Sequence, residues 1–241
     1  LLDLNYVVTG VDISEELFTE KELLSRGVVI SNFDNIKLVD IKTNIVIYSS
    51  AYKDSEIVKY LKVKYPTFEY HEFLSYLLSG KKVIAISGTH GKTTTTSMIS
   101  HILLEGDLDP TISVGGILKA IGGNIRVGNS GTFITEACEY TNSFLHFFPK
   151  ISVILNIEED HLDFFKDLED IRHSFHQFAE LLPEDGTLII NAEIKDYAEI
   201  YEGLSCNVVT YGTNGCFDYS AKNITYDENG HVAFDLFRRG E

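Results

Sequence analysis

The sequence predicts an α/β protein of two consecutive domains, in which the sheets are mostly parallel. Short runs rich in β-branched residues alternate along the chain with segments of helical periodicity, and this alternation is typical of βα units. At 241 residues the chain is longer than one typical domain of ~150 residues. Its apolar content of 44% is sufficient for two buried cores.

The first domain is expected to cover residues 1–80 and to be Rossmann-like. Strands are predicted at residues 6–9, 28–31 and 45–49, and helices at residues 15–26, 54–64 and 71–78. The turn Gly80-Lys81-Lys82 marks the predicted domain boundary. Because the chain opens on Leu1 and leads directly into a strand, we expect the natural domain to begin earlier.

The second domain is expected to cover residues 81–241. It begins with a buried strand at residues 83–87, a glycine-bearing turn at residues 88–92 and a helix from Thr93. Further strands are predicted at residues 133–136, 152–156, 187–191 and 207–211, a helix at residues 168–182, and a hairpin between residues 223–226 and 231–237. In the helix that begins at Thr93, four apolar residues are expected to share one face: Met98, Ile99, Ile102 and Leu103.

The charge balance excludes several classes of partner. With 20 basic and 36 acidic residues, the net charge of −16 repels nucleic-acid phosphates and anionic lipid, so we expect no nucleic-acid partner. The three cysteines have no CxxC spacing, which argues against a zinc site or a disulfide framework. The sequence also lacks a signal peptide and any apolar run of ~18 residues, so we expect a cytoplasmic protein without membrane insertion. The sequence does not determine the oligomeric state.

The turn after the predicted strand 83–87 has the features of a phosphate-binding loop. Glycines let backbone N–H groups approach phosphate oxygens, and the helix N-terminus adds a partial positive charge. Lys92 is placed to reach the β and γ phosphates of ATP, and the Thr93 hydroxyl is placed to bind Mg²⁺. The alternative is a plain glycine turn with a surface lysine. The expected nucleotide-binding residues are Gly88, Thr89, His90, Gly91, Lys92, Thr93 and Thr94.

This loop differs from the common P-loop. The pattern GxxxxGK[ST] would need a glycine where the chain has Ile86. The mismatch argues against an ordinary P-loop ATPase or GTPase, but the order of strand, glycine turn, Lys-Thr and helix is what phosphate binding requires. The second domain is therefore expected to be an ATP-binding domain of P-loop type with a shorter loop.

Three further residues lie at or shortly after the ends of predicted strands, where ligands bind in open α/β sheets. Glu136 ends one strand and is placed to hold Mg²⁺ beside Thr93, although a solvated acid is the alternative. Asn156 ends another strand and is expected to orient the following turn or to contact nucleotide. His161 follows in a turn with three acids; an isolated histidine is otherwise most often a surface or core residue.

In the first domain, small and acidic side chains follow predicted strands. Asp12 stands where Rossmann-like folds often place an acid that contacts a ribose or base. Ser49, Ser50 and Ala51 end the strand 45–49, and the two serines are expected to face the same crevice. Surface capping is the alternative for both groups.

Five segments in order resemble the Mur ligases, which join amino acids to UDP-muramoyl precursors. They are most similar to the members that add L-alanine to UDP-N-acetylmuramate, and the likeness covers nearly the whole chain. The segments are Gly88-Thr89-His90-Gly91-Lys92-Thr93-Thr94, Ser49-Ser50-Ala51, Val114-Gly115-Gly116, Thr135-Glu136-Ala137-Cys138-Glu139 and Asn156-Ile157-Glu158-Glu159-Asp160-His161-Leu162-Asp163.

The resemblance implies an ATP- and Mg²⁺-dependent ligase of peptidoglycan precursor synthesis. Lys92, Glu136 and His161 would be its catalytic residues, and the first domain would hold the UDP-sugar with Asp12, Ser49, Ser50 and Ala51. Thr93 and Glu136 would bind one magnesium, while His161 would serve a second magnesium at the γ-phosphate. The resemblance also implies an earlier glycine-rich loop for the diphosphate and a later C-terminal domain for the amino acid, both expected to be missing from this chain.

The chain departs from the family pattern at Cys138 and Asn142, where many relatives carry acids. A substrate contact at Asn142 is therefore in doubt. Cys138 has no base in its motif and is expected to pack rather than act as a nucleophile.

Two alternative functions stay open on the sequence. One is another Mur-type ligase that recycles muropeptides or resembles the folylpolyglutamate or cyanophycin enzymes. The other is a nucleotide-binding ATPase that joins nothing; the short loop and the Rossmann-like first domain argue against it.

Overall fold

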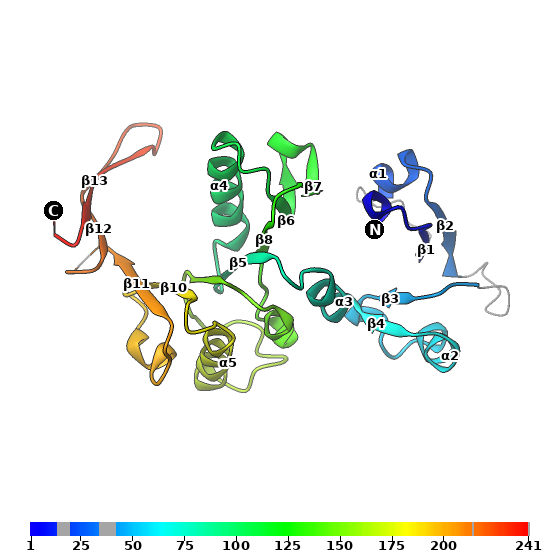
Figure 1. The fold of residues 1–241 in the computed structure, drawn as a ribbon. Coiled ribbons are helices and arrows are strands. Elements are labelled where there is room, and N and C mark those ends of the chain that lie inside the picture. Colours follow the sequence, from blue (N-terminus) through cyan, green and yellow to red (C-terminus); the bar gives the residue numbers. More distant parts are fainter. Residues whose placement is uncertain (14–19, 34–41, 214, 241) are drawn as a thin grey trace. The chain divides into compact units, whose positions relative to one another are not determined.

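The fold is described from a computed structural model of the chain, which covers residues 1–13, 20–33, 42–213 and 215–240 (Figure 1). The chain divides into two compact units, Leu1–Phe73 and Leu74–Glu241. The division falls inside helix α3 (Tyr70–Leu77), because Leu74 and Leu78 pack into the core of the second unit. The turn at Gly80, where the sequence places the domain boundary, therefore lies within that second unit.

The first unit contains two pairs of parallel strands. Strand β1 (Thr9–Asp12) pairs with β2 (Val29–Asn32), and β3 (Val46–Tyr48) pairs with β4 (Thr67–Glu69). Its α-helices are α1 (Glu20–Ser25), α2 (Glu56–Lys64) and the start of α3.

The predicted elements of this unit are only partly correct. The first strand was expected at residues 6–9, but Leu2–Leu4 form a 3₁₀ helix and Val7 is 98% exposed, so the strand begins at Thr9. The front of the predicted helix 15–26 falls on residues 14–19, outside the described residues. Strand β4 was not predicted, because three residues after Pro66 carry too little pattern.

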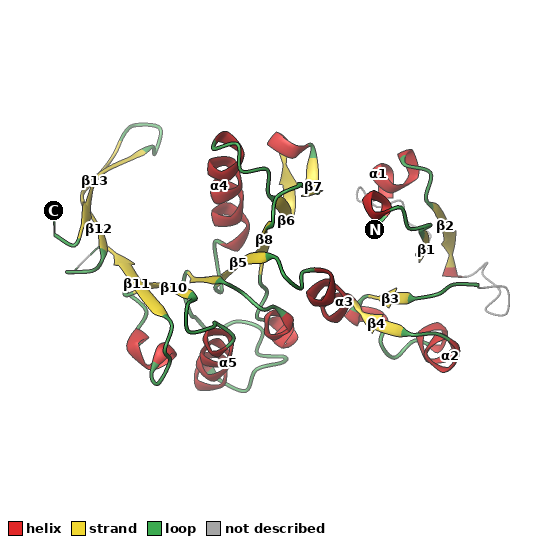
Figure 2. Ribbon diagram, viewed as in Figure 1, coloured by secondary structure: helices red, strands yellow, loops and turns green. Residues whose placement is uncertain are grey.

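The second unit is built on a nine-stranded sheet of order β13-β12-β11-β10-β9-β5-β8-β6-β7 (Figures 1 and 2). The pairings are parallel except at β12–β13 and β6–β7, so the predicted α/β class with a mostly parallel sheet is confirmed. The predicted C-terminal hairpin is also confirmed. The strands are β5 (Lys82–Ser87), β6 (Thr111–Leu118), β7 (Gly123–Arg126), β8 (Thr132–Glu136), β9 (Ile151–Ile154), β10 (Thr187–Asn191), β11 (Asn207–Gly212), β12 (Tyr219–Tyr226) and β13 (Val232–Arg238).

Helices cover both faces of this sheet. Helix α5 (Leu168–Glu180) packs on one face with Phe175 and Phe178, and the ring of Phe178 stacks on that of Phe144 with centroids 4.7 Å apart. Helix α4 (Lys92–Glu105) lies on the opposite face. Because side chains alternate along a strand, Val83 and Ala85 of β5 point into the first of these cores, and Ile84 and Ile86 point into the second.

The four apolar residues predicted to share one face of α4 differ in how they pack. Ile99 and Leu103 do pack against the sheet. Met98 and Ile102, however, are 61% and 69% exposed, and the remaining positions against the sheet are filled by the small residues Thr96 and Ser100. At 3.6 residues per turn, residues 98 and 102 lie on a different side of the helix from residues 96, 99, 100 and 103.

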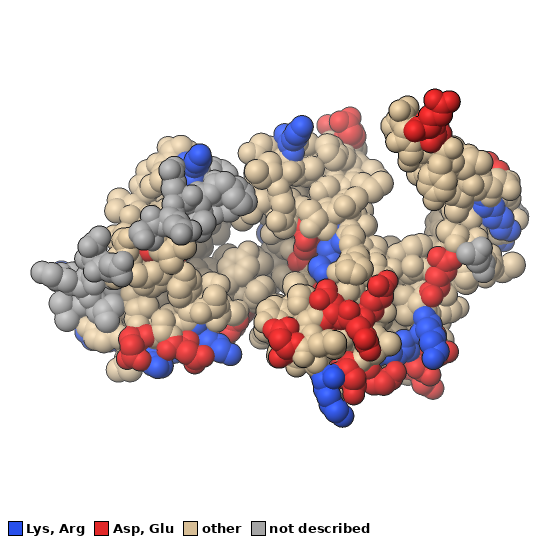
Figure 3. All heavy atoms as spheres, turned by 180° about the vertical axis from the view of Figure 1, so that it is seen from behind, with Lys and Arg blue, Asp and Glu red and all other residues tan. Residues whose placement is uncertain are grey.

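Surface charge follows the composition. On the face drawn in Figure 3, acidic side chains gather on the second unit with basic ones interspersed, consistent with the net charge of −16. No helix in the described part of the chain has both the length and the apolar character needed to cross a membrane.

Candidate nucleotide and cation site

The phosphate loop follows β5, an inner strand of the larger sheet. Strand β5 ends at Ser87 and α4 begins at Lys92, so the loop lies between the ends of the parallel neighbours β8 and β9. Gly88 has φ 143°, and a Cβ there would lie 3.0 Å from Leu155 Cβ. Gly91 is the N-cap of α4 with φ 84°. Both glycines are therefore required by the backbone, one by close packing and both by a positive φ.

Asn156 braces this loop from the end of β9. The His90 N–H donates to Asn156 Oδ1 at 2.7 Å, and Asn156 Nδ2 donates to the His90 carbonyl at 2.9 Å. The Thr89 N–H donates to the Asn156 carbonyl at 3.2 Å, and the Glu158 N–H donates to Thr89 Oγ1 at 3.0 Å. Asn156 thus lies against the phosphate loop and orients it, whereas the sequence led us to expect that it would orient the turn that follows it or contact nucleotide.

Lys92 turns back into the protein. Its Nζ donates to the Gly88 carbonyl at 2.6 Å and to the Thr89 carbonyl at 3.2 Å. It also lies 3.1 and 2.9 Å from the two carboxylate oxygens of Glu139, whose side chain is only 2% exposed. Glu139 was not among the site residues expected from the sequence, although it lies in the segment Thr135-Glu136-Ala137-Cys138-Glu139 that resembles the Mur ligases.

Thr93 and Glu136 form a pair of hard oxygen donors at the mouth of the loop. Thr93 Oγ1 donates to Glu136 Oε2 at 3.0 Å, and the Gly115 N–H donates to Glu136 Oε1 at 2.5 Å. A Cβ on Gly115 would lie 2.8 Å from Glu136 Oε2, so a side chain at position 115 would displace the carboxylate from this place. This contact explains why Val114-Gly115-Gly116 accompanies the loop, and the oxygen donors suit Mg²⁺.

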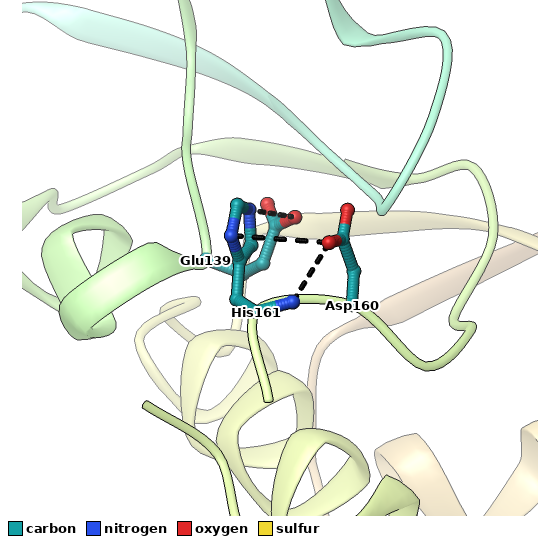
Figure 4. Close-up of side chains that lie close together, drawn as sticks. All are labelled: Glu139, Asp160 and His161. Carbon is teal, nitrogen blue, oxygen red and sulfur yellow. Dashed lines mark hydrogen bonds and ion pairs between the residues drawn. The ribbon is translucent and has the colours of Figure 1, made fainter. Parts of the chain in front are cut away.

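His161 lies in a second group, with Glu139 rather than Glu136 (Figure 4). One ligand atom each of Glu139, Asp160 and His161 fall within 4.8 Å of one another. His161 Nε2 is 3.9 Å from Glu139 Oε1, and the His161 N–H donates to Asp160 Oδ1 at 2.7 Å. The predicted metal residues are therefore divided between two groups, Thr93 with Glu136 and His161 with Glu139 and Asp160.

The two departures from the family pattern have structural roles. Burial raises the pKa of the Cys138 thiol, which disfavours the thiolate and fits the expected packing role. Asn142 has φ 57°, and its side-chain oxygen accepts a hydrogen bond from Ser174 of α5. Asn142 is thus engaged with the core helix.

The first unit has a pocket of its own, with a volume of about 320 Å³. Asp12 and Ser49 both line it, as predicted, together with Phe33 and Tyr52, whose ring centroids are 5.0 Å apart. Ser50 and Ala51 do not line it. Ser50 Oγ instead donates to Glu69, and Ala51 is exposed in the 3₁₀ helix Ser50–Tyr52.

The chain is similar to Mur ligases in its match to a family model, in its sequence relatives and in its fold. Residues 86–240 match the family model of the Mur ligase middle domain. A UDP-N-acetylmuramate–L-alanine ligase of Clostridium novyi is 51% identical over 247 residues, which cover 100% of this chain and 52% of that protein. The chain thus spans about half the length of the curated relatives it matches.

Two solved structures have similar folds. The UDP-N-acetylmuramate:L-alanyl-γ-D-glutamyl-meso-diaminopimelate ligase of Neisseria meningitides superposes with a TM-score of 0.86 at 25% identity, over 99% of this chain and 78% of that one. A UDP-N-acetylmuramate–alanine ligase of Thermotoga maritima superposes with a TM-score of 0.81 at 23% identity, over 100% of this chain and 54% of that one. The model of the Mur ligase middle domain matches well over half of the residues of this chain. The chain therefore belongs to the Mur ligase family.

Proposed function

We propose that this chain provides the ATP- and Mg²⁺-binding part of a cytoplasmic ligase that joins UDP-N-acetylmuramate to L-alanine during peptidoglycan precursor synthesis. The observation that carries the proposal is the loop at the end of β5, where Lys92 and the Thr93–Glu136 pair lie beside a braced backbone. The choice of substrates is supported by the 51% identity to a ligase of that name.

The chemistry requires two anions to meet. A carboxylate oxygen of UDP-N-acetylmuramate attacks the γ-phosphorus of ATP, giving an acyl phosphate and ADP. The amine of L-alanine then attacks the acyl carbon, phosphate leaves with the carboxylate oxygen, and the amine loses a proton. No enzyme nucleophile is needed, and the raised pKa of Cys138 is consistent with that.

The residues of this chain have electrostatic and positioning roles in these steps. The loop N–H groups and the N-terminus of α4 would hold the phosphates, and Lys92 would neutralise charge on the transferred group. Thr93 and Glu136 would hold one Mg²⁺, and the group of Glu139, Asp160 and His161 has the donors for a second cation. Bound there, Mg²⁺ would supply charge neutralisation to the phosphoryl oxygens.

The first unit would hold the uridine part of the acceptor. Its pocket presents Asp12 and Ser49 as polar contacts, and the Phe33–Tyr52 ring pair as an apolar wall for a planar base. A pocket with mostly apolar walls and few polar groups is typical of small-molecule sites.

Phosphate release tests the proposal against its rivals. With the full-length protein, ATP and Mg²⁺, release is expected only when UDP-N-acetylmuramate and L-alanine are both present. Release with the tripeptide L-alanyl-γ-D-glutamyl-meso-diaminopimelate instead of L-alanine would make it a peptide-adding ligase. Rapid release with ATP alone would contradict a ligase function and favour a simple ATPase.

A further inference from the structure

Lys92, the lysine expected to bind the nucleotide phosphates, is held in an ion pair with Glu139. An ammonium group has three N–H donors, while Lys92 Nζ lies within hydrogen-bond distance of four acceptor atoms of Gly88, Thr89 and Glu139. The Lys92 side chain is 16% exposed and that of Glu139 is 2% exposed, so water contributes little to either charge. The donors of Lys92 are thus already used within the protein.

Binding of a phosphate to Lys92 must therefore break some of these contacts. The two carbonyls belong to a loop fixed by Gly88 packing on Leu155 and by Thr89 bonding to Asn156. Glu139 is the charged partner, and a buried carboxylate that loses its cation is strongly destabilised. Nucleotide binding alone would leave that charge uncompensated.

A position for a replacement cation lies beside Glu139, in its group with Asp160 and His161. Its Oε1 faces His161 Nε2 at 3.9 Å, and Asp160 contributes a third ligand atom within 4.8 Å. Two carboxylates offer the hard oxygen donors that Mg²⁺ prefers. A divalent cation at this position would take over from Lys92 as the counter-ion of Glu139.

We propose that Glu139 is a positioning residue that couples cation binding to nucleotide binding: a divalent cation at Glu139 releases Lys92 for the nucleotide phosphate. This inference rests on the proposed function, since it assumes that the loop binds ATP. It also gives Glu136 and Glu139 different roles. Glu136 bonds to Thr93 and Gly115, and Glu139 holds the lysine.

The test is the affinity for a non-hydrolysable ATP analogue, measured by calorimetry on the full-length protein with Mg²⁺ and with a chelator. Glu139→Gln is expected to bind the analogue about tenfold more tightly than the wild type without Mg²⁺, because Lys92 is no longer held by a buried charge. Its gain in affinity on adding Mg²⁺ should shrink by a similar factor, since coupling is reciprocal.

Glu136→Gln is the matched control. It removes one negative charge from the same site without freeing Lys92, so it measures the general electrostatic effect. Equal Mg²⁺-free affinities for the two variants would overturn the coupling. Glu139→Asp keeps the charge, so its affinity for the analogue without Mg²⁺ should stay closer to that of the wild type than that of Glu139→Gln does.

A measurement on the wild type covers the case in which Glu139→Gln does not fold. Mg²⁺ alone should increase acylation of the Lys92 amine by an amine-reactive reagent several-fold, read by peptide mass spectrometry. Unchanged labelling would overturn the coupling. A wild type that binds no ATP analogue under any condition would instead contradict the proposed function itself.

Discussion

Replacing Lys92 with alanine is expected to lower ATP-dependent turnover by roughly a thousandfold or more, the scale set by removing a charged group from a preorganised site. Lys92 is the cation that begins α4 and lies within 3.2 Å of the Gly88 and Thr89 carbonyls of the loop. Initial rates of phosphate release at saturating substrates measure the effect. Lys119→Ala, at an exposed lysine of the same unit, should leave the rate unchanged.

The stability of this variant needs its own control. Lys92→Ala leaves the buried Glu139 without its lysine counter-ion, so the melting temperature should fall. The double variant Lys92→Ala/Glu139→Gln removes the unpaired charge and should recover the melting temperature without recovering turnover. A folded Lys92→Ala protein with a near-normal rate would contradict the role of the loop.

Glu136→Gln is expected to lower turnover by about a hundredfold and to raise the Mg²⁺ concentration needed for half-maximal rate. The carboxylate is held by Thr93 Oγ1 and by the Gly115 N–H, so a neutral amide keeps the shape of the site but weakens its attraction for the cation. Rates measured across a Mg²⁺ titration separate the two effects. Glu105→Gln, at the exposed end of α4, serves as the control. An unshifted Mg²⁺ dependence would exclude Glu136 as a ligand.

The parts of the site that are contiguous in sequence could be predicted from it. Strand, glycine turn and helix N-terminus follow one another around Lys92, and their geometry depends on local backbone rules. Glu136 and Asn156 were also predictable, because both follow strands that end at the same sheet edge as β5.

Contacts between distant segments could not be predicted in the same way. Glu139 stands 47 residues after Lys92, and its burial against the lysine depends on how the chain turns after β8. The sequence likewise did not reveal β6 and β7, because glycines such as Gly115 weaken a strand pattern. Here the glycine is needed for the contact with Glu136.

In the first unit, only one of the two adjacent serines predicted to face the crevice lines the pocket, for a similar reason. Ser49 and Ser50 are adjacent, but the 3₁₀ helix that begins at Ser50 turns that side chain toward Glu69. Only Ser49 lines the pocket with Asp12. The direction of the backbone at this turn decides which of the two serines lines the pocket. The pattern of side chains in the sequence does not reveal that direction.

In the proposed mechanism, phosphoryl transfer at the loop beside Lys92 activates the carboxylate of UDP-N-acetylmuramate. Oxygen-18 in both carboxylate oxygens of UDP-N-acetylmuramate tests it, with mass spectrometry of the phosphate released in the presence of ATP, Mg²⁺ and L-alanine. An acyl phosphate predicts that one labelled oxygen leaves in each phosphate and the other stays in the amide. Phosphate that carries oxygen from water and none from the carboxylate would contradict the account.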